Sequence, residues 1–503
     1  MTTMPDWLRQ RAASTPKRLA LVCGADRLSY AALDVAVDTA ASELQSQGVR
    51  AGQIVALLSG NSAAFVVAVH AVSRVRAVLM PMNLRLTPAE LTFQLRDSGA
   101  RHLLASAVPV GVQHATPLQL ASKLLKALPT IVVHDLEALT TTGDVTTSAA
   151  LQDARFDLDA MHTIVYTSGT TGTPKGAMLT FGNHFWSATG SAYNLGVRED
   201  DRWLAVLPLF HVGGLAILLR SVLYGTTAVV HESFDAARAN RAIDHDGITI
   251  VSVVANMLQR MLDERRDKPY PASLRCVLLG GGPAPEPLLR RCEAIGVPVV
   301  QTYGLTEAAS QVATLAPEDA LPKLGSAGKP LFGTEVRIVD ATSQRCGAGK
   351  PGEIVVRGPT VSPGYLNRRE ESARGLRDGW LHTGDIGYLD DDGYLYVLDR
   401  RDDLIVSGGE NVYPAEIEAV LQSHPAVSEG GVWGVEHPRW GQAPVAAVVL
   451  REGLATTPEL LIEYCRERLA AYKVPSRIEF VEELPRNAAG KLLRSELRRR
   501  GSL

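Results

Sequence analysis

The chain has 503 residues, too many for a single hydrophobic core, and this length predicts at least two domains. Its 46% apolar and 21% charged residues are ordinary for a soluble globular protein. Its formal net charge of −3 excludes a general electrostatic attraction to nucleic acid or anionic lipid. Five scattered cysteines without a CxxC pair argue against a disulfide framework or a zinc site, and the N-terminus lacks the pattern of a signal peptide. We expect a cytoplasmic protein with small-molecule partners, and its oligomeric state stays open, a homo-oligomer included.

The first third of the chain alternates between strand and helix patterns. Apolar runs predict strands at 19–22, 27–29, 54–58 and 78–80, and helical spacing predicts helices at 30–47 and 63–75. The most apolar segment, 63–82, is interrupted by His70, Ser73, Arg74 and Arg76, which makes it a poor membrane span. This order is a βαβ unit and predicts a parallel sheet. Residues 112–155 carry only a weak pattern, in which 140–143 and 146–148 suggest surface loop.

The rest of the chain predicts three further regions. Helices at 183–195 and 215–225 and strands at 203–207, 248–254, 275–279 and 297–300 continue the first region; short strands and turns fill 326–399; a small module of helices and strands spans 403–503. The predicted fold class is α/β, with a large N-terminal domain of βαβ-type sheets plus a β-subdomain, followed by a small α+β C-terminal domain. A charge cluster at 398–405 predicts the linker between the two domains.

The stretch from Tyr166 to Gly176 follows a buried strand end and contains five Ser or Thr hydroxyls, three glycines and Lys175, without any acid. Glycines let backbone N–H groups face a ligand, hydroxyls donate hydrogen bonds, and lysine supplies a point charge, so the stretch predicts a polyphosphate site. A Walker A loop would need Gly-Lys-Ser/Thr, whereas here Pro174 precedes the lysine and Gly176 follows it. A flexible linker is the alternative, but the flanking apolar patterns leave little room for one.

A second motif, Gln301 to Glu307, follows the strand at 297–300. Tyr303 can stack on a flat base, Thr306 can bond a phosphate oxygen, and Glu307 can hold Mg²⁺, which needs only one or two carboxylates besides phosphate oxygens and water. Alternatively, Glu307 is an acid favoured by the dipole at a helix N-terminus.

The nine residues from Ser168 to Gly176 resemble the phosphate-loop signature of the acyl-adenylate-forming superfamily, which contains acyl-CoA synthetases, luciferases and peptide-synthetase adenylation domains. Further matches extend the resemblance over nearly the whole chain. It implies a polyphosphate site at Thr167, Ser168, Gly169, Thr170, Thr171, Gly172 and Lys175, and an adenine site at Gly281, Gly282, Pro283, Thr302, Tyr303 and Gly304. It also implies a ribose contact by Asp385, a contact of Arg400 with the ribose or the α-phosphate, a hinge at Asp402, and a thiol tunnel at Gly408 and Gly409.

The same resemblance divides the chain into an ATP- and acid-binding domain, 1–401, and a mobile domain, 402–503. It implies ATP, Mg²⁺ and coenzyme A as cofactors and co-substrate, with Lys491, Lys175, Thr306 and Glu307 as catalytic groups and Glu307 as the metal ligand. Lys491 would bridge the substrate carboxylate and the nucleotide, although a lysine in a polar loop is ordinarily only solvated. Arg494 and the cations at 498–500 fit a solvated helix face better than a coenzyme A phosphate site.

Segments around Pro208–Gly225, Leu278–Pro285 and Gln301–Gln311 resemble one branch, the 2-succinylbenzoate–CoA ligases of menaquinone biosynthesis. Its substrate has a second carboxylate, which needs polar groups at the far end of the acid pocket. The candidates for that pocket are His211, Arg220, Ser310 and Gln311. A core position for His211 is an equal alternative, and pairing of Arg220 with a nearby acid is favoured over contact with a ligand.

Four other functions compete with this one. A ligase for a fatty or aryl acid would use the same machinery. A non-catalytic nucleotide-binding scaffold is disfavoured because Lys491, Glu307 and Lys175 are all present. A P-loop NTPase is disfavoured because the phosphate loop lacks the sequence Gly-Lys-Ser/Thr. A luciferase-type oxygenase would carry the same motifs, but the succinylbenzoate-like segments argue against it.

Overall fold

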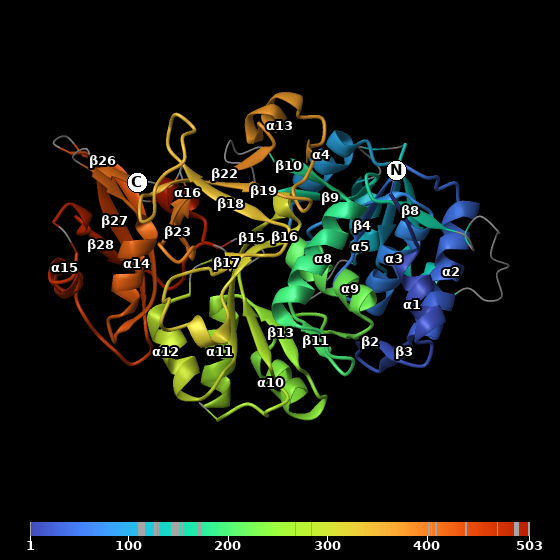
Figure 1. Cartoon of the computed structure of the whole chain (residues 1–503), viewed down its shortest axis with the longest axis horizontal. Coiled ribbons are helices and arrows are strands. Elements are labelled where there is room, and N and C mark those ends of the chain that lie inside the picture. Colours follow the sequence, from blue (N-terminus) through green and yellow to red (C-terminus); the bar gives the residue numbers. More distant parts are fainter. Residues whose placement is uncertain are drawn as a thin grey trace.

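Figure 1 shows the structure, a computed structural model. It describes residues 2–108, 116–124, 128, 130–141, 151, 154–167, 174–266, 268–282, 284–400, 403, 405–407, 410–437, 440–469, 471–486 and 492–500. In these ranges the chain forms two large sheets, a β-subdomain and a C-terminal lobe, the last lying far from the N-terminus in Figure 1.

The first large sheet is mostly parallel and carries the strand that leads into the phosphate loop. Its described strands, in spatial order, are β20 (Gly364–Tyr365), β10 (Lys175–Thr180), β9 (Met161–Thr167), β5 (Val78–Pro81), β4 (Ile54–Leu58), β6 (His102–Ala105) and β7 (Val132–Asp135). The predicted βαβ unit is confirmed, because α3 (Ala63–Arg74) connects β4 to its parallel neighbour β5. A short pair, β1 (Thr3–Pro5) with β8 (Arg155–Asp157), lies apart from this sheet.

The second large sheet carries the motif from Gln301 to Glu307. Its described strands, in spatial order, are β17 (Lys329–Pro330), β16 (Ser310–Thr314), β15 (Val299–Leu305), β14 (Cys276–Leu279), β13 (Ile250–Val253), β11 (Arg202–Ala205), β12 (Thr227–Val230), β2 (Leu19–Cys23) and β3 (Asp26–Ser29). The strands predicted at 19–22 and 27–29 are confirmed as β2 and β3, which pair antiparallel. Strands β11 to β15 are parallel, whereas β16 returns antiparallel to β15.

Helices fill the space between the two sheets and cover their outer faces. One buried cluster joins both sheets through α1 (Trp7–Ser14), α2 (Tyr30–Ser46), α3, α6 (Leu136–Thr141), α8 (Phe181–Leu195) and α9 (Val212–Tyr224). A second cluster packs α10 (Ala236–His245), α11 (Ala255–Arg265) and α12 (Glu286–Ala294) on the second sheet, and a third packs α4 (Pro88–Ser98) and α5 (Pro117–Leu124) on the first. Burial of these apolar faces, at roughly 25 cal/mol per Å², stabilises the arrangement.

The β-subdomain and the C-terminal lobe each have a sheet and a core of their own. The subdomain contains β18 (Glu335–Val339), β19 (Gly352–Arg357), β21 (Leu376–Arg377), β22 (Trp380–Leu389), β23 (Leu395–Arg400) and α13 (Arg369–Gly375). The lobe contains β24 (Ile405–Ser407), β25 (Glu410–Val412), β26 (Val427–His437), β27 (Gly441–Leu450), β28 (Ile478–Phe480), α14 (Pro414–Gln422), α15 (Pro458–Arg466) and α16 (Arg494–Arg500). The predicted α/β class with a small α+β domain is confirmed.

Three local expectations were wrong. Of the residues predicted as surface loop, 140–141 belong to α6, and 142–143 and 146–148 lie outside the described residues. The weakly patterned stretch before them contains α5 and β7, because even a short apolar run gains stability once the sheet beside it is present. The strand predicted to end at Val300 continues to Leu305, where β16 supplies its hydrogen-bond partners. The predicted linker begins later than residue 398, because Asp399 and Arg400 belong to β23 and pair with β22. Within the described ranges, every helix is too short or too polar to cross a bilayer.

Three buried histidines lie where α3, β9 and α8 meet. His162 Nε2 lies 2.7 Å from Ser73 Oγ, and His184 Nε2 lies 2.9 Å from Thr163 Oγ1. Burial lowers the pKa of His70 to about 4, that of His184 to about 3, and that of His162 well below its ordinary value. The rings are therefore neutral in the folded protein at neutral pH.

We predict that these histidines make the fold sensitive to acid. Below about pH 6.5 these histidines bind protons in the unfolded chain but stay neutral in the folded chain. The free energy of unfolding therefore falls by about 1.4 kcal/mol per pH unit for each ring. Denaturant unfolding from pH 7 to 5 should show a shallower slope for His184→Gln than for the wild type. The exposed His245 supplies the control, since His245→Gln should keep the wild-type slope. An unchanged slope in His184→Gln would contradict this account.

Candidate active site

The described part of the phosphate loop is its two ends. Lys175 begins β10 and pairs directly with Thr167 at the end of β9, so the antiparallel ladder closes the loop at its base. Predicted residues Ser168, Gly169, Thr170, Thr171 and Gly172 lie outside the described residues. The Lys175 ammonium lies 5.7 Å from the centre of the Tyr365 ring, so its charge is next to this ring at the sheet edge.

Tyr365 also reaches the predicted metal ligand. Its hydroxyl donates a 2.8 Å hydrogen bond to Glu307 Oε1, and it comes from β20, which pairs with β10. Glu307 lies in the short 3₁₀ helix Thr306–Ala308, directly after β15. Tyr365 therefore links the lysine from one sheet to the carboxylate from the other, although 58 residues separate it from Glu307. One carboxylate at this point suits Mg²⁺ bound mainly through phosphate oxygens and water. The described residues contain no cluster of three or more metal-ligating side chains.

Tyr303, the aromatic residue of the second motif, contacts Asp385, the residue predicted to bind the ribose. The Tyr303 hydroxyl donates a 2.6 Å hydrogen bond to Asp385 Oδ2. Asp385 lies in β22 opposite Arg400 of β23, so the register places the two predicted ribose residues side by side along the backbone. Their closeness supports a site for one nucleoside rather than two separate functions.

Glycines in both segments predicted to bind the nucleotide permit close backbone approach. A Cβ at Gly304 would lie 1.7 Å from the carbonyl oxygen of Ser310, so only glycine fits where β15 meets β16. In the segment predicted for adenine, Gly281 has φ +85°, and a Cβ at Gly282 would meet no atom within 4 Å. This bare backbone after β14 can accept a flat ring. Pro283 lies outside the described residues.

The hydroxyl of Thr302, also predicted to bind nucleotide, is used within the sheet. It donates to the carbonyl oxygen of Ala313 at 2.9 Å and lies 3.0 Å from the Thr314 hydroxyl. Gln311, predicted for the acid pocket, lies beside this pair: its Nε2 donates to Thr314 Oγ1 at 3.2 Å. Gln311 is 2% exposed, and its Oε1 is buried without a hydrogen-bond partner. An orphaned buried acceptor costs free energy unless a ligand or water satisfies it.

The other acid-pocket residues surround a small apolar cluster. Val165, Leu179, Val212 and Ala309 pack together and join the first sheet, α9 and the start of β16. Val212 follows His211 and Ala309 precedes Ser310, so both predicted pocket residues flank this cluster. His211 Nε2 is buried without a partner, and burial lowers the pKa of its ring to about 4. A neutral ring with one unused nitrogen can bond a ligand but carries no charge for it.

Arg220 in α9 corrects one expectation. We favoured pairing with an acid, but Arg220 is 2% exposed and forms no ion pair with any carboxylate of the described chain. Its Nη2 donates to Ser187 Oγ at 3.1 Å, and its guanidinium lies 5.8 Å from the centre of the Trp203 ring. Its Nε has no hydrogen-bond partner among the described residues. Burial lowers the pKa of Arg220 but leaves an arginine charged at neutral pH.

Ser187 connects this charge to the pocket backbone. Its hydroxyl donates a 2.6 Å hydrogen bond to the carbonyl oxygen of Ala309. Ala309 and Ser310 have φ of +52° and +102°, the left-handed region that non-glycine residues rarely adopt. Such strain persists only where surrounding contacts hold it, and it is common at ligand sites. Ser187 and Tyr365 are the two contributors that the sequence did not reveal, since neither lies in a motif with a local signature.

The predicted residues of the mobile domain are less completely described. Lys491, Asp402, Gly408 and Gly409 lie outside the described residues, and Arg400 is described through its backbone. Arg494 is not on a solvated face: its side chain is 11% exposed and donates to Glu418 Oε2 at 2.7 Å. The expectation holds for Arg499, which is exposed beside Glu496.

Comparison with known families decides the assignment. A model described as "AMP-binding enzyme" matches residues 8–366, and one described as "AMP-binding enzyme C-terminal domain" matches residues 416–491. The chain belongs to the AMP-binding enzyme family. The predicted superfamily, its fold and its class as an acid–thiol ligase are thus confirmed.

Two relatives show how closely this member of the family matches others. The chain is 52% identical to a 2-succinylbenzoate–CoA ligase of Geobacillus kaustophilus over 99% of this chain and 98% of that protein. It is 44% identical to the o-succinylbenzoate CoA synthetase of Bacillus subtilis, covering 99% of this chain and 98% or more of that one. The TM-score is 0.90 for that enzyme's complexes with its acyl-adenylate intermediate and with ATP and magnesium ion. It is 0.75 for its double mutant bound to a product analogue, with coverage of 99% of each chain.

We predict that the Tyr365 hydroxyl fixes the orientation of Glu307. Tyr365→Phe removes a hydrogen bond to a charged group, typically about 1.5–3 kcal/mol, and should lower kcat about 10- to 100-fold while raising the Mg²⁺ concentration needed for half-maximal rate. The measurement is a magnesium titration of pyrophosphate release. Tyr394→Phe removes a similar bond, to Asp319, and serves as the matched control. An unchanged magnesium dependence in Tyr365→Phe would show that the contact does not position the metal ligand.

Proposed function

We propose that this protein activates 2-succinylbenzoate with ATP and transfers the acyl group to coenzyme A, releasing AMP and diphosphate. The observation that carries the choice of acid is the buried charge of Arg220, which pairs with no carboxylate of the described residues and is held through Ser187 next to the strained Ala309–Ser310 backbone. A substrate with a second carboxylate can compensate this charge, whereas a monoacid cannot. The similarity to ligases named for this acid supports the same choice.

The first half-reaction joins two anions that repel each other, the substrate carboxylate and the α-phosphate of ATP. Lys175, Thr306 and the phosphate loop would hold the phosphates, Glu307 the Mg²⁺, and Tyr303 and Asp385 the nucleoside. Lys491 would lie between carboxylate and α-phosphate, where its charge lowers the repulsion. The carboxylate then attacks the α-phosphorus, the bond to diphosphate breaks, and acyl-AMP forms. Most of the rate gain comes from positioning and charge neutralisation.

In the second half-reaction the coenzyme A thiolate attacks the acyl carbonyl and AMP leaves. Lys491 and the pantetheine arm would use the same approach to the carbonyl, so they act in turn. The domain 402–503 would rotate about Asp402, withdraw Lys491 and bring Gly408 and Gly409 to the thiol. A cytoplasmic location is part of the proposal, since all five cysteines are free thiols and four of them are buried.

A panel of acids tests this function. Purified protein with ATP, Mg²⁺ and coenzyme A should form AMP and diphosphate from 2-succinylbenzoate with a kcat/KM at least about tenfold above that for 4-oxo-4-phenylbutanoate, benzoate or octanoate. The second acid differs from the first only by the ring carboxylate, so it isolates the contribution of that group. A higher kcat/KM for octanoate or benzoate would replace the proposed substrate with a fatty or aryl acid. Release of ADP and phosphate would contradict the acyl-adenylate route.

A further inference from the structure

One hydrogen bond joins the large domain directly to β26 of the C-terminal lobe. The side-chain amide of Asn256, in the first turn of α11, donates to Glu429 Oε1 at 2.9 Å. Figure 1 shows α11 and α12 on the side of the large domain that faces this lobe. Asn256 follows β13, a neighbour of the strand that leads to the predicted adenine segment. The contact therefore lies between the lobe and the part of the large domain expected to hold the nucleotide.

The second oxygen of the same carboxylate binds the base of the segment that contains Lys491. Glu429 Oε2 accepts from Arg486 Nη2 at 2.7 Å, with the two side chains 24% and 31% exposed. Arg486 forms an isolated antiparallel bridge with Leu492, so its backbone closes the chain just before and just after residues 487–491. Glu429 thus contacts the large domain with one oxygen and the base of the Lys491 segment with the other.

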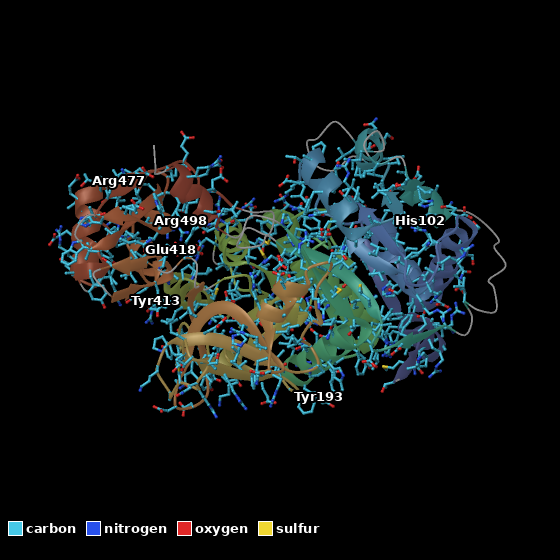
Figure 2. All side chains as sticks on the ribbon, turned by 90° about the horizontal axis from the view of Figure 1, so that it is seen from above. His102, Tyr193, Tyr413, Glu418, Arg477 and Arg498 are labelled. Carbon is cyan, nitrogen blue, oxygen red and sulfur yellow. The ribbon has the colours of Figure 1, made fainter. Side chains whose placement is uncertain are left out.

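The described contacts of the downstream flank lie within the lobe. Arg494 donates to Glu418 Oε2, Asp403 Oδ2 lies 3.3 Å from Arg494 Nη1, and Asp403 Oδ1 lies 3.2 Å from Arg498 Nη2. Figure 2 labels Glu418 and Arg498, which both lie in the lobe. Because both partners of each contact belong to the lobe, the contacts are kept when the lobe moves as a unit. Of the ion pairs described at the two flanks, the Glu429–Arg486 pair is the one whose carboxylate also bonds the large domain.

We propose that Glu429 is a positioning residue for the first half-reaction: it couples docking of the lobe on Asn256 to placement of the Lys491 segment. The structure has this contact in an arrangement with a TM-score of 0.90 to the acyl-adenylate complex and 0.75 to the product-analogue complex of the related enzyme. Each oxygen of the Glu429 carboxylate binds a different partner, Asn256 or Arg486. We therefore expect that loss of either bond weakens the coupling between docking of the lobe and placement of the Lys491 segment. Glu429 touches no reacting atom in this account and acts through Lys491.

The proposal rests on the acyl-adenylate mechanism and separates its two halves. Acid-dependent exchange of pyrophosphate into ATP, with 2-succinylbenzoate, measures the first half-reaction; thioester formation from supplied succinylbenzoyl-AMP measures the second. Asn256→Ala and Glu429→Ala should each lower the exchange kcat about tenfold, leave KM for ATP within about twofold, and leave thioester formation within about twofold. The double variant should be no worse than Glu429→Ala, because both remove the same coupling.

Two further variants guard against a purely structural effect. Glu429→Gln keeps an acceptor for Asn256 but loses the ion pair with Arg486, so its exchange rate should lie between those of the wild type and Glu429→Ala. Glu463→Ala removes an exposed ion pair with Arg466 elsewhere in the lobe and should leave both rates unchanged. Equal losses in both half-reactions, or an unchanged exchange rate in Glu429→Ala, would overturn the proposal. Absence of exchange in the wild type would instead refute the proposed substrate or mechanism.

Discussion

The proposed choice of substrate depends on one buried positive charge, that of Arg220. Arg220 is surrounded by protein, bonds a serine hydroxyl, and has no carboxylate partner in the described chain. Removing a guanidinium from water without a counter-charge costs several kcal/mol, and that cost is tolerated here because helix α9 is otherwise apolar and well packed. The same positive charge lowers the pKa of the nearby His184, after burial itself. A site that carries stored positive potential before its ligand arrives is preorganised for an anion.

The remaining groups of the site come from strands of three different sheets. β10 brings Lys175, β15 leads to Glu307, β20 brings Tyr365 and β22 brings Asp385. Strand β10 packs through Leu179, β15 through Val299 and β22 through Leu381 in three different buried clusters, so the polar contacts between these strands add geometry rather than hold the fold together. The Ala309–Ser310 backbone has positive φ at the start of β16, where the acid-pocket residues meet the strand that carries the nucleotide residues.

The sequence predicted those features whose physics is local. Hydroxyls, glycines and a lysine in one short stretch indicate a phosphate loop. Tyr303, Thr306 and Glu307 lie close together in the sequence and together predict a nucleotide and Mg²⁺ site. Contacts over long separations were not predictable: Tyr365 meets Glu307 58 residues away, and Ser187 meets Ala309 122 residues away. The pairing of Arg220 and the solvation of Arg494 were predicted wrongly for the same reason. Charge alone indicates that a partner is needed, and only the tertiary structure shows which one is present.

The most direct test of the account is a thermodynamic cycle between Arg220 and the ring carboxylate of the substrate. Calorimetric binding of 2-succinylbenzoate and of 4-oxo-4-phenylbutanoate is measured for the wild type and for Arg220→Met, a substitution of similar length without charge. The account predicts that the wild type binds the diacid at least about tenfold more tightly than the monoacid and that Arg220→Met loses this preference, a coupling of at least about 1.4 kcal/mol. An equal preference for the diacid in both proteins would show that the buried guanidinium does not recognise the second carboxylate.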